Sequence, residues 1–172
     1  RHTRYISVTG VQTCALPICG WEGIKVRLTA KASTAAQADE LLGRWEAEVR
    51  ALVGDIVFGV DDDTMESVVL QLLRERGLTL GLAESVTGGL VAGRITNVPG
   101  SSDVLRGGVV SYASDVKYSV LGVPEGPVVS EPAAVSMAEG ARRVLGADVG
   151  LALTGVAGPA EQEGLPAGTL CV

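Results

Sequence analysis

Apolar and polar residues alternate along the chain in two patterns, and each pattern predicts one type of element. An apolar residue at every second position predicts a half-buried strand, whereas apolar residues three and four positions apart predict a helix with one apolar face. The first pattern covers 20–31, and the second covers 33–53 and ends at Gly54. A further short strand is expected over 55–60. These elements form a β-α-β piece of about 40 residues, which is too small to be a complete domain.

From residue 61 onward, apolar strands, glycine-containing turns and helices alternate. The strands are runs of Leu, Val and Ala, which are typical of strands that helices cover on both faces. The expected strands are 78–83, 104–113, 148–154 and 167–172, and the expected helices are 63–77, 87–97, 114–121 and 130–145. This alternation predicts an α/β fold, a three-layer α/β/α sandwich around a largely parallel sheet. We expect it to occupy 61–172, preceded by a partial small α+β domain over 19–60.

The first eighteen residues fit neither pattern. They start without Met, and Gln12, Thr13 and Pro17 interrupt the apolar stretch of roughly 7–15 residues that a signal peptide needs. The run VTGVQTCALPI over 8–18 resembles the in-frame translation of a sequencing-library adapter. We therefore expect 1–18 to be a non-native or disordered segment, and an ordinary disordered arm is the alternative.

Composition narrows the class of partner. The chain has 14 basic and 20 acidic residues, a formal net charge of −6, which argues against a nucleic-acid or anionic-membrane surface. No apolar run reaches the roughly 18 residues that span a bilayer. Three cysteines without CxxC spacing are typical of a cytoplasmic protein. We expect a small-molecule ligand, no nucleic acid, no membrane and a cytoplasmic location.

Histidine is nearly absent, and this limits the chemistry. The one histidine, His2, lies in the segment expected to be non-native. Ser-His-Asp and Cys-His catalysis and His-containing zinc sites are therefore excluded, and we expect no metal. Neither a GxGxxG nor a P-loop sequence occurs, and we expect no cofactor. A nucleophilic serine would need another base, such as a lysine whose pKa is lowered by burial.

Three segments at the ends of expected strands carry candidate chemistry. In the first, Ser85 precedes Thr87, Gly88 and Gly89 at the start of a helix. Ligands of α/β sheets gather outside the carboxyl ends of the strands, and free N–H groups at a helix start can stabilise an oxyanion. The alternative is that Ser85 or Thr87 simply caps the helix.

The second segment, SYASDVK, contains Tyr112 and Lys117, and the third, TGVAGP, contains Thr154, Gly155 and Gly158. Lys117 is a candidate base, and Tyr112 could relay or orient a proton. The alternative is that a lysine on a short helix faces solvent. In the third segment, small residues let the backbone approach a ligand, and successive N–H groups can bind an anion. A structural turn has the same composition.

The motifs AESVTGG, GGVVSYASDVK, VSEPAA and TGVAGP, in this order and spacing over 62–172, resemble the C-terminal domain of the CinA competence/damage-inducible family. That domain is the same unit as the stand-alone nicotinamide mononucleotide amidohydrolase PncC. The segment 20–60 resembles the KH-like middle domain of the family. A larger N-terminal domain, which in the family carries nucleotide-pyrophosphatase activity, is not in this sequence, so we expect a fragment.

The resemblance implies hydrolytic deamidation of nicotinamide mononucleotide to nicotinate mononucleotide and ammonia, a step of pyridine-nucleotide recycling. It implies that Ser85 is the nucleophile, that Lys117 is the general base and that Tyr112 assists this pair. It also implies a homodimer. The binding residues that it implies are Thr87, Gly88 and Gly89 for the oxyanion, and Thr154, Gly155 and Gly158 for the nucleotide.

Two departures from the family pattern bear on this expectation. Many relatives have a glycine run after TGVAGP, whereas this chain has acidic residues at Glu161 and Glu163. The family also continues beyond Val172 through a further strand and a helix, so we expect a weakened or inactive fragment. A non-catalytic nucleotide-binding module is the alternative function, although Ser85, Tyr112 and Lys117 are all present. A nucleic-acid module, suggested by the KH-like resemblance, is disfavoured by the acidic charge.

Overall fold

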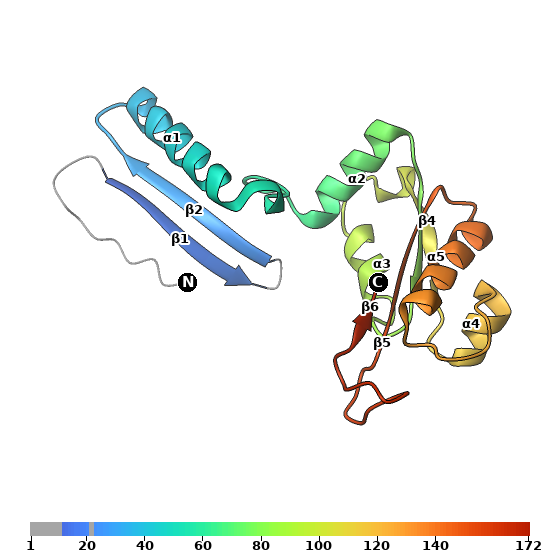
Figure 1. Cartoon of the computed structure of the whole chain (residues 1–172). Coiled ribbons are helices and arrows are strands. Elements are labelled where there is room, and N and C mark those ends of the chain that lie inside the picture. The colour runs from blue at the N-terminus through green and yellow to red at the C-terminus, as the bar shows by residue number, and fades with distance from the viewer. Residues whose placement is uncertain (1–11, 21–22) are drawn as a thin grey trace. The chain divides into compact units, whose positions relative to one another are not determined.

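The structure is a computed structural model that describes the backbone of residues 12–20 and 23–172, with side chains from residue 23 onward. The chain divides into two compact units, 1–65 and 66–172. Figure 1 shows the hairpin and helix of the first unit and the layered sheet of the second. No helix in the described part of the chain combines the length and apolar character needed to span a membrane.

The first unit is built from a β-hairpin and one long helix. Strand β1 (Gln12–Gly20) pairs antiparallel with β2 (Gly23–Lys31). Helix α1 (Ala35–Val53) begins after Thr34, whose hydroxyl accepts the N–H of Gln37, and it ends at Gly54 as predicted. A single 3-10 turn, η1 (Gly54–Ile56), follows.

Two expectations for this unit are wrong. No element was expected within 1–18, but β1 begins at residue 12, because pairing with β2 supplies the hydrogen bonds that its own irregular pattern does not predict. The strand expected over 55–60 is absent from this described segment, where the 3-10 turn is followed by irregular chain. There the N–H of Val60 donates to the Asp63 carboxylate, which turns the chain toward the next helix. The non-native origin of 1–18 stays a prediction, and residues 1–11 lie outside the described residues.

The second unit contains a four-stranded sheet in the order β4-β3-β5-β6. Its strands are β3 (Leu80–Glu84), β4 (Leu105–Val110), β5 (Val149–Gly155) and β6 (Leu170–Cys171). The central strand β3 is parallel to both β4 and β5, whereas β6 is antiparallel to β5. The predicted, largely parallel sheet is therefore confirmed.

Helices cover both faces of this sheet, as predicted. They are α2 (Met65–Arg76), α3 (Leu90–Thr96), α4 (Ser114–Leu121) and α5 (Glu131–Leu145), with a 3-10 turn η2 (Ser101–Asp103) before β4. On one face Ala83 and Ala152 pack against residues of α4 and α5. On the other face Leu80 and Leu82 pack against residues of α2 and α3. All five residues of β3 are buried, which places the core around this strand and fixes where it ends.

Helix α5 lies close to α4 and to β5 because a glycine occupies each point of contact, Gly140 on the helix and Gly150 on the strand. A Cβ added at Gly140 would lie 2.2 Å from the carbonyl oxygen of Leu121, and one added at Gly150 of β5 would lie 2.3 Å from the carbonyl oxygen of Ala138. Neither contact is tolerable for a real side chain. The sheet, α4 and α5 are therefore held in one tight arrangement, and this arrangement positions the residues described next.

Candidate active site

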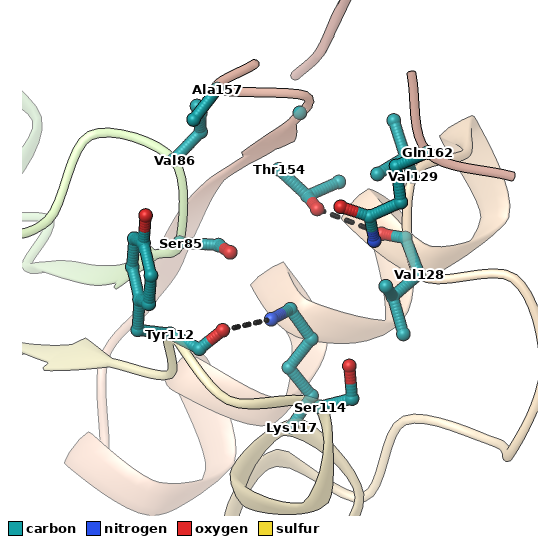
Figure 2. Close-up of a pocket in the computed structure, with 11 residues that line it drawn as sticks. Ser85, Val86, Tyr112, Ser114, Lys117, Val128, Val129, Thr154, Ala157 and Gln162 are labelled. Carbon is teal, nitrogen blue, oxygen red and sulfur yellow. Dashed lines mark hydrogen bonds between the residues drawn. The ribbon is translucent and has the colours of Figure 1, made fainter. Parts of the chain in front are cut away.

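A pocket opens at the carboxyl ends of β3, β4 and β5, the edge at which α/β sheets commonly bind ligands. Figure 2 shows the lining side chains converging from these strand ends and from the segment before α5. The pocket is lined by Ser85, Val86, Tyr112, Ser114, Lys117, Val128, Val129, Thr154, Gly155, Ala157 and Gln162. Five predicted site residues thus lie in one pocket, namely Ser85, Tyr112, Lys117, Thr154 and Gly155.

Ser85 directly follows the buried strand β3 and is itself buried. Its N–H donates to the carbonyl of Leu153 at 2.9 Å, which extends the pairing of β3 with β5 by one residue and fixes the Ser85 backbone. Figure 2 shows the Ser85 hydroxyl directed into the same space as the amine of Lys117. A hydroxyl and an amine that share a pocket are the components of a nucleophile with its base.

Lys117 is buried, although it lies on a short helix whose other residues are mostly exposed. Only 2% of the residue is accessible, and its Nζ donates to the carbonyl oxygens of Ser111 at 2.7 Å and Tyr112 at 3.3 Å. Burial lowers the pKa of Lys117, while the negative charge of Glu163 opposes this effect without cancelling it. The neutral amine, which is the form that can accept a proton, is therefore favoured relative to an exposed lysine.

Tyr112 contributes its backbone to the site. Its carbonyl oxygen accepts from Lys117, but its side chain is 65% exposed, and Figure 2 shows the phenol hydroxyl directed away from the lysine amine. The expectation that the Tyr112 phenol relays a proton is not supported by this placement. The role that the geometry gives Tyr112 is to orient the Lys117 amine through a carbonyl acceptor.

The N–H groups at the start of α3 are already occupied, and this corrects the expected oxyanion site. The buried carboxylate of Glu84 accepts from the N–H groups of Gly89 and Val91 at 3.1 Å each and of Ala92 at 2.7 Å. The N–H of Gly88 donates to the carbonyl of Ser85 at 3.0 Å. Gly88 and Gly89 therefore cannot offer these donors to a substrate, and neither residue lines the pocket.

Glu84 was not recognised from the sequence, because the sequence does not show whether a carboxylate next to Ser85 points into the pocket or toward the following helix. Burial alone would raise the pKa of Glu84, but hydrogen bonds from the N–H groups of Ala92, Val91 and Gly89 lower it. The residue is a carboxylate anchor that joins the end of β3 to α3.

Two N–H groups in the turn after Ser85 remain available. Among the described residues, no backbone or side-chain acceptor takes the N–H of Val86 or of Thr87. Val86 also lines the pocket, whereas Thr87 does not. The N–H that follows a nucleophile is a common oxyanion donor, because the developing charge forms next to it.

Only part of the third predicted segment, TGVAGP, lines the pocket: Thr154 and Gly155 do, whereas Gly158 lies in the following loop. Thr154 is buried and its hydroxyl donates to the carbonyl of Val128 at 2.7 Å, which leaves its oxygen free to accept. Gly155 lines the pocket, and a Cβ there would lie 2.4 Å from the carbonyl oxygen of Thr169. Gly158 does not line the pocket. It has a φ of 81° and lies against Ala167, so its glycine serves the turn.

The remaining lining residues were not predicted to belong to the site. Val128 and Val129 are apolar positions without a chemical signature, and Gln162 belongs to the variable loop in which only the charges stood out. The lining residues that sequence reasoning missed are Val86, Ser114, Val128, Val129, Ala157 and Gln162. Within the described residues no group of three or more His, Cys, Asp or Glu side chains could hold a metal ion.

Comparison with known proteins gives matches along most of the chain. The family model of the CinA C-terminal domain matches residues 62–172, and that of the damage-inducible protein CinA KH domain matches residues 17–59. A CinA-like protein of Frankia casuarinae is 52% identical over 151 residues, which is 85% of this chain and 35% of the relative. A putative competence-damage inducible protein of Desulforamulus reducens is 44% identical over 154 residues, 87% of this chain and 38% of the relative. The chain thus spans little more than a third of the length of these curated relatives.

Solved structures agree with these matches. The competence-damaged protein (CinA) superfamily protein of Escherichia coli shares 35% identity and a TM-score of 0.61, over 67% of this chain and 73% of that chain. The competence damage-inducible protein A of Klebsiella pneumoniae shares 34% identity and a TM-score of 0.59, over 61% of this chain and 69% of that chain. The layered sheet of 66–172 is thus a fold with solved relatives.

Proposed function

The chain belongs to the CinA family, and from this premise we propose that its C-terminal domain is a Ser/Lys amidase that deamidates nicotinamide mononucleotide. The products are nicotinate mononucleotide and ammonia. The observation that carries the proposal is the pairing of a buried serine with a buried, pKa-lowered lysine in one pocket at the strand ends. The residues between 23 and 172 contain no histidine, so this lysine is the group that can serve as base.

The first half of the reaction acylates the serine. Ser85 Oγ attacks the carboxamide carbon while Lys117 Nζ accepts the hydroxyl proton, and the carbonyl oxygen becomes an oxyanion beside the N–H group of Val86, which lines the pocket. Collapse of this intermediate breaks the carbon–nitrogen bond. Lys117 returns the proton to the leaving nitrogen, ammonia departs, and an acyl ester of Ser85 remains.

The second half hydrolyses the ester. A water molecule attacks the acyl carbon while Lys117 again accepts a proton, and the same N–H group of Val86 stabilises the oxyanion. Collapse releases the carboxylate product and returns the proton to Ser85 Oγ. The carbonyl oxygens of Ser111 and Tyr112 keep the Lys117 amine in place through both halves, because they accept from it and do not compete for its lone pair in the neutral form.

The test is ammonia release from nicotinamide mononucleotide by the purified protein, compared with Ser85→Ala and Lys117→Met. Methionine matches lysine in volume without a titratable group. Each substitution is expected to lower kcat by about a thousandfold or more, with nucleotide binding retained in calorimetry. Turnover that survives either substitution contradicts the Ser/Lys mechanism.

A nucleotide-binding module without catalysis is the competing function. It predicts that the folded protein binds nicotinamide mononucleotide and releases no ammonia even at alkaline pH, where the neutral form of Lys117 is favoured. The same calorimetric and ammonia measurements therefore separate the two functions.

A further inference from the structure

The loop after Gly158 contains a tight turn that presents a glutamate toward the pocket. Gln162 and Leu165 exchange both backbone hydrogen bonds, at 3.0 and 2.9 Å, and the two residues between them have positive φ values, 55° at Glu163 and 75° at Gly164. This is the backbone of a hairpin turn that favours Asn, Asp or Gly at its first position. Glutamate is unfavourable there, so a contact of its side chain must compensate.

That contact is with the pocket wall. The two carboxylate oxygens of Glu163 accept from the N–H groups of Val128 and Val129, each at 3.0 Å. Both valines line the pocket. The carbonyl of Val128 is held from the other side by the Thr154 hydroxyl. The pocket wall formed by Val128 and Val129 is therefore held by two side chains, Thr154 of β5 and Glu163 of the loop after Gly158.

The carboxylate also brings a negative charge to the pocket of Lys117. Glu163 is the charged group whose field acts on the Lys117 amine, and the attraction is mutual because Lys117 contributes to lowering the pKa of Glu163. Glu84, at the end of β3, is directed to the N–H groups of α3 instead. The other titratable groups on the elements around Lys117 are exposed, with Tyr118 of α4 half-buried. The exposed groups are Tyr112 after β4, Asp115 on α4, Glu131, Glu139, Arg142 and Arg143 on α5, and Glu161 in the loop.

We propose that Glu163 is a positioning residue of this site: its carboxylate holds the N–H groups of Val128 and Val129, which anchors the loop on the pocket wall and brings a negative charge to the pocket that contains the Lys117 amine. The proposal rests on the proposed function for its catalytic consequence, but its structural part is independent of it. Glu163 does not itself line the pocket; it acts through Val128 and Val129, which do, and through its charge on Lys117. Of the two acidic residues in this loop, Glu163 is directed to the pocket wall, whereas Glu161 is exposed to solvent.

Removing the Glu163 charge should change the protonation of Lys117 in one direction. The charge of Glu163 favours the protonated amine, so removing it lowers the pKa of Lys117 further. Because the neutral amine is the base, the acid limb of the kcat/KM profile then moves to lower pH. Glu163 lies at the exposed rim, so salt weakens its effect.

The experiment measures the pKa of Lys117 directly by NMR titration of the lysine side chains. The chain has only three lysines, Lys25, Lys31 and Lys117, and the Lys117→Met variant assigns the third signal. Glu163→Gln removes the charge, Glu163→Asn removes it with a residue that suits the turn, and Glu163→Asp restores it. Glu161→Gln, which removes an exposed charge from the same loop, is the matched control.

We expect a lower Lys117 pKa in Glu163→Gln and Glu163→Asn, an unchanged value in Glu161→Gln, and a return toward the native value in Glu163→Asp. Raising the salt concentration should shrink the difference. A Lys117 pKa that is the same in the Glu163 and Glu161 variants overturns the proposal. A shifted pKa in a folded protein that binds nicotinamide mononucleotide but releases no ammonia supports the role of Glu163 and rejects the amidase function, so the two failures are distinguishable.

Discussion

Glu84 and Lys117 are both buried charged residues near the same strand ends, yet their environments favour opposite forms. The Glu84 carboxylate has three N–H donors at 2.7 to 3.1 Å, which favour the charged form. Lys117 has two carbonyl acceptors and little accessible surface, and burial favours its neutral form. Glu84 therefore serves as a structural anchor, whereas Lys117 can give up and accept a proton.

The anchor can be tested by stability. Glu84→Gln replaces one carboxylate oxygen with an NH2 group that faces N–H donors, and it should lower the free energy of unfolding by about 2–4 kcal/mol. Urea unfolding at pH 7 measures the change, and Glu139→Gln on the exposed face of α5 is the control. Equal effects of the two substitutions would refute the anchoring role.

The pH dependence of this contribution follows from the lowered pKa of Glu84. The carboxylate stabilises the fold above its unfolded pKa of about 4.5, and the stabilisation is lost as the pH falls through the lower, folded value. The difference between native protein and Glu84→Gln should therefore shrink below pH 4. A difference that is constant down to pH 2 would contradict a charged Glu84.

In contrast to Glu84, Lys117 should lower the stability of the fold while serving the proposed reaction. Its burial disfavours the ammonium, so the native protein is penalised at every pH below the folded pKa of Lys117, and the penalty disappears as the pH rises to the ordinary value of 10.5. Lys117→Met should thus be at least as stable as the native protein at pH 7, and the native protein should gain relative to it toward pH 10. Thermal unfolding at both pH values measures this. A large loss of stability in Lys117→Met at pH 7 would show that the lysine is structural.

At the scale of elements, local pattern predicted the helices better than the strands. The helix expected over 114–121 coincides with α4 (Ser114–Leu121), and the helix expected over 130–145 corresponds to α5 (Glu131–Leu145), which Ser130 caps. A helix forms its hydrogen bonds within its own segment, so caps and spacing suffice to locate it. Strand β1 forms by pairing with β2 although its segment shows no strand pattern. Residues 55–60 were expected to form a strand but have no partner strand among the described residues, so local pattern misled in opposite directions.

The tight approach of α5 gives a prediction with a matched control. Gly140→Ala places a Cβ 2.2 Å from the carbonyl oxygen of Leu121, so α4 and α5 must move apart, at an expected loss of about 3 kcal/mol or more. Gly93→Ala in α3 meets nothing within 4 Å and should instead stabilise by up to about 1 kcal/mol, because alanine favours helix. Denaturant unfolding of both variants measures the difference, and a stable Gly140→Ala would show that the helices are not in close contact.

At the scale of the whole molecule, the two units differ in how much they bury. None of the residues described in the first unit, 23–65, is buried, whereas the second unit contains two large apolar clusters on the faces of its sheet. Amides of α1 should therefore exchange with solvent orders of magnitude faster than those of α5, because opening free energies follow burial. Hydrogen exchange by mass spectrometry measures this. Equal protection of the α1 and α5 amides against exchange would contradict the prediction that the first unit is less stable than the second.

The site itself was predictable only in part from the sequence. Strand-end positions located Ser85, Lys117 and Thr154, because parallel strands bring their carboxyl ends together. Side-chain direction at a strand end was not predictable. Adjacent residues point in different directions, and only the packed structure shows that Glu84 is directed to α3 and Ser85 to the pocket. The contact of Glu163 with the pocket wall needs a backbone conformation that glutamate rarely adopts.

The strand order has a consequence for synthesis of the chain. Strand β3 is central, but its partner β5 follows β4, α4 and α5 in the sequence. As the ribosome produces the chain, one hydrogen-bonding edge of β3, whose five residues are all buried in the folded domain, stays open until Val149–Gly155 has emerged. An open, flat, apolar edge is a template for pairing with other chains. The nascent protein is therefore vulnerable to aggregation until β5 is translated, and Ser85 acquires its backbone partner, Leu153, at that same moment.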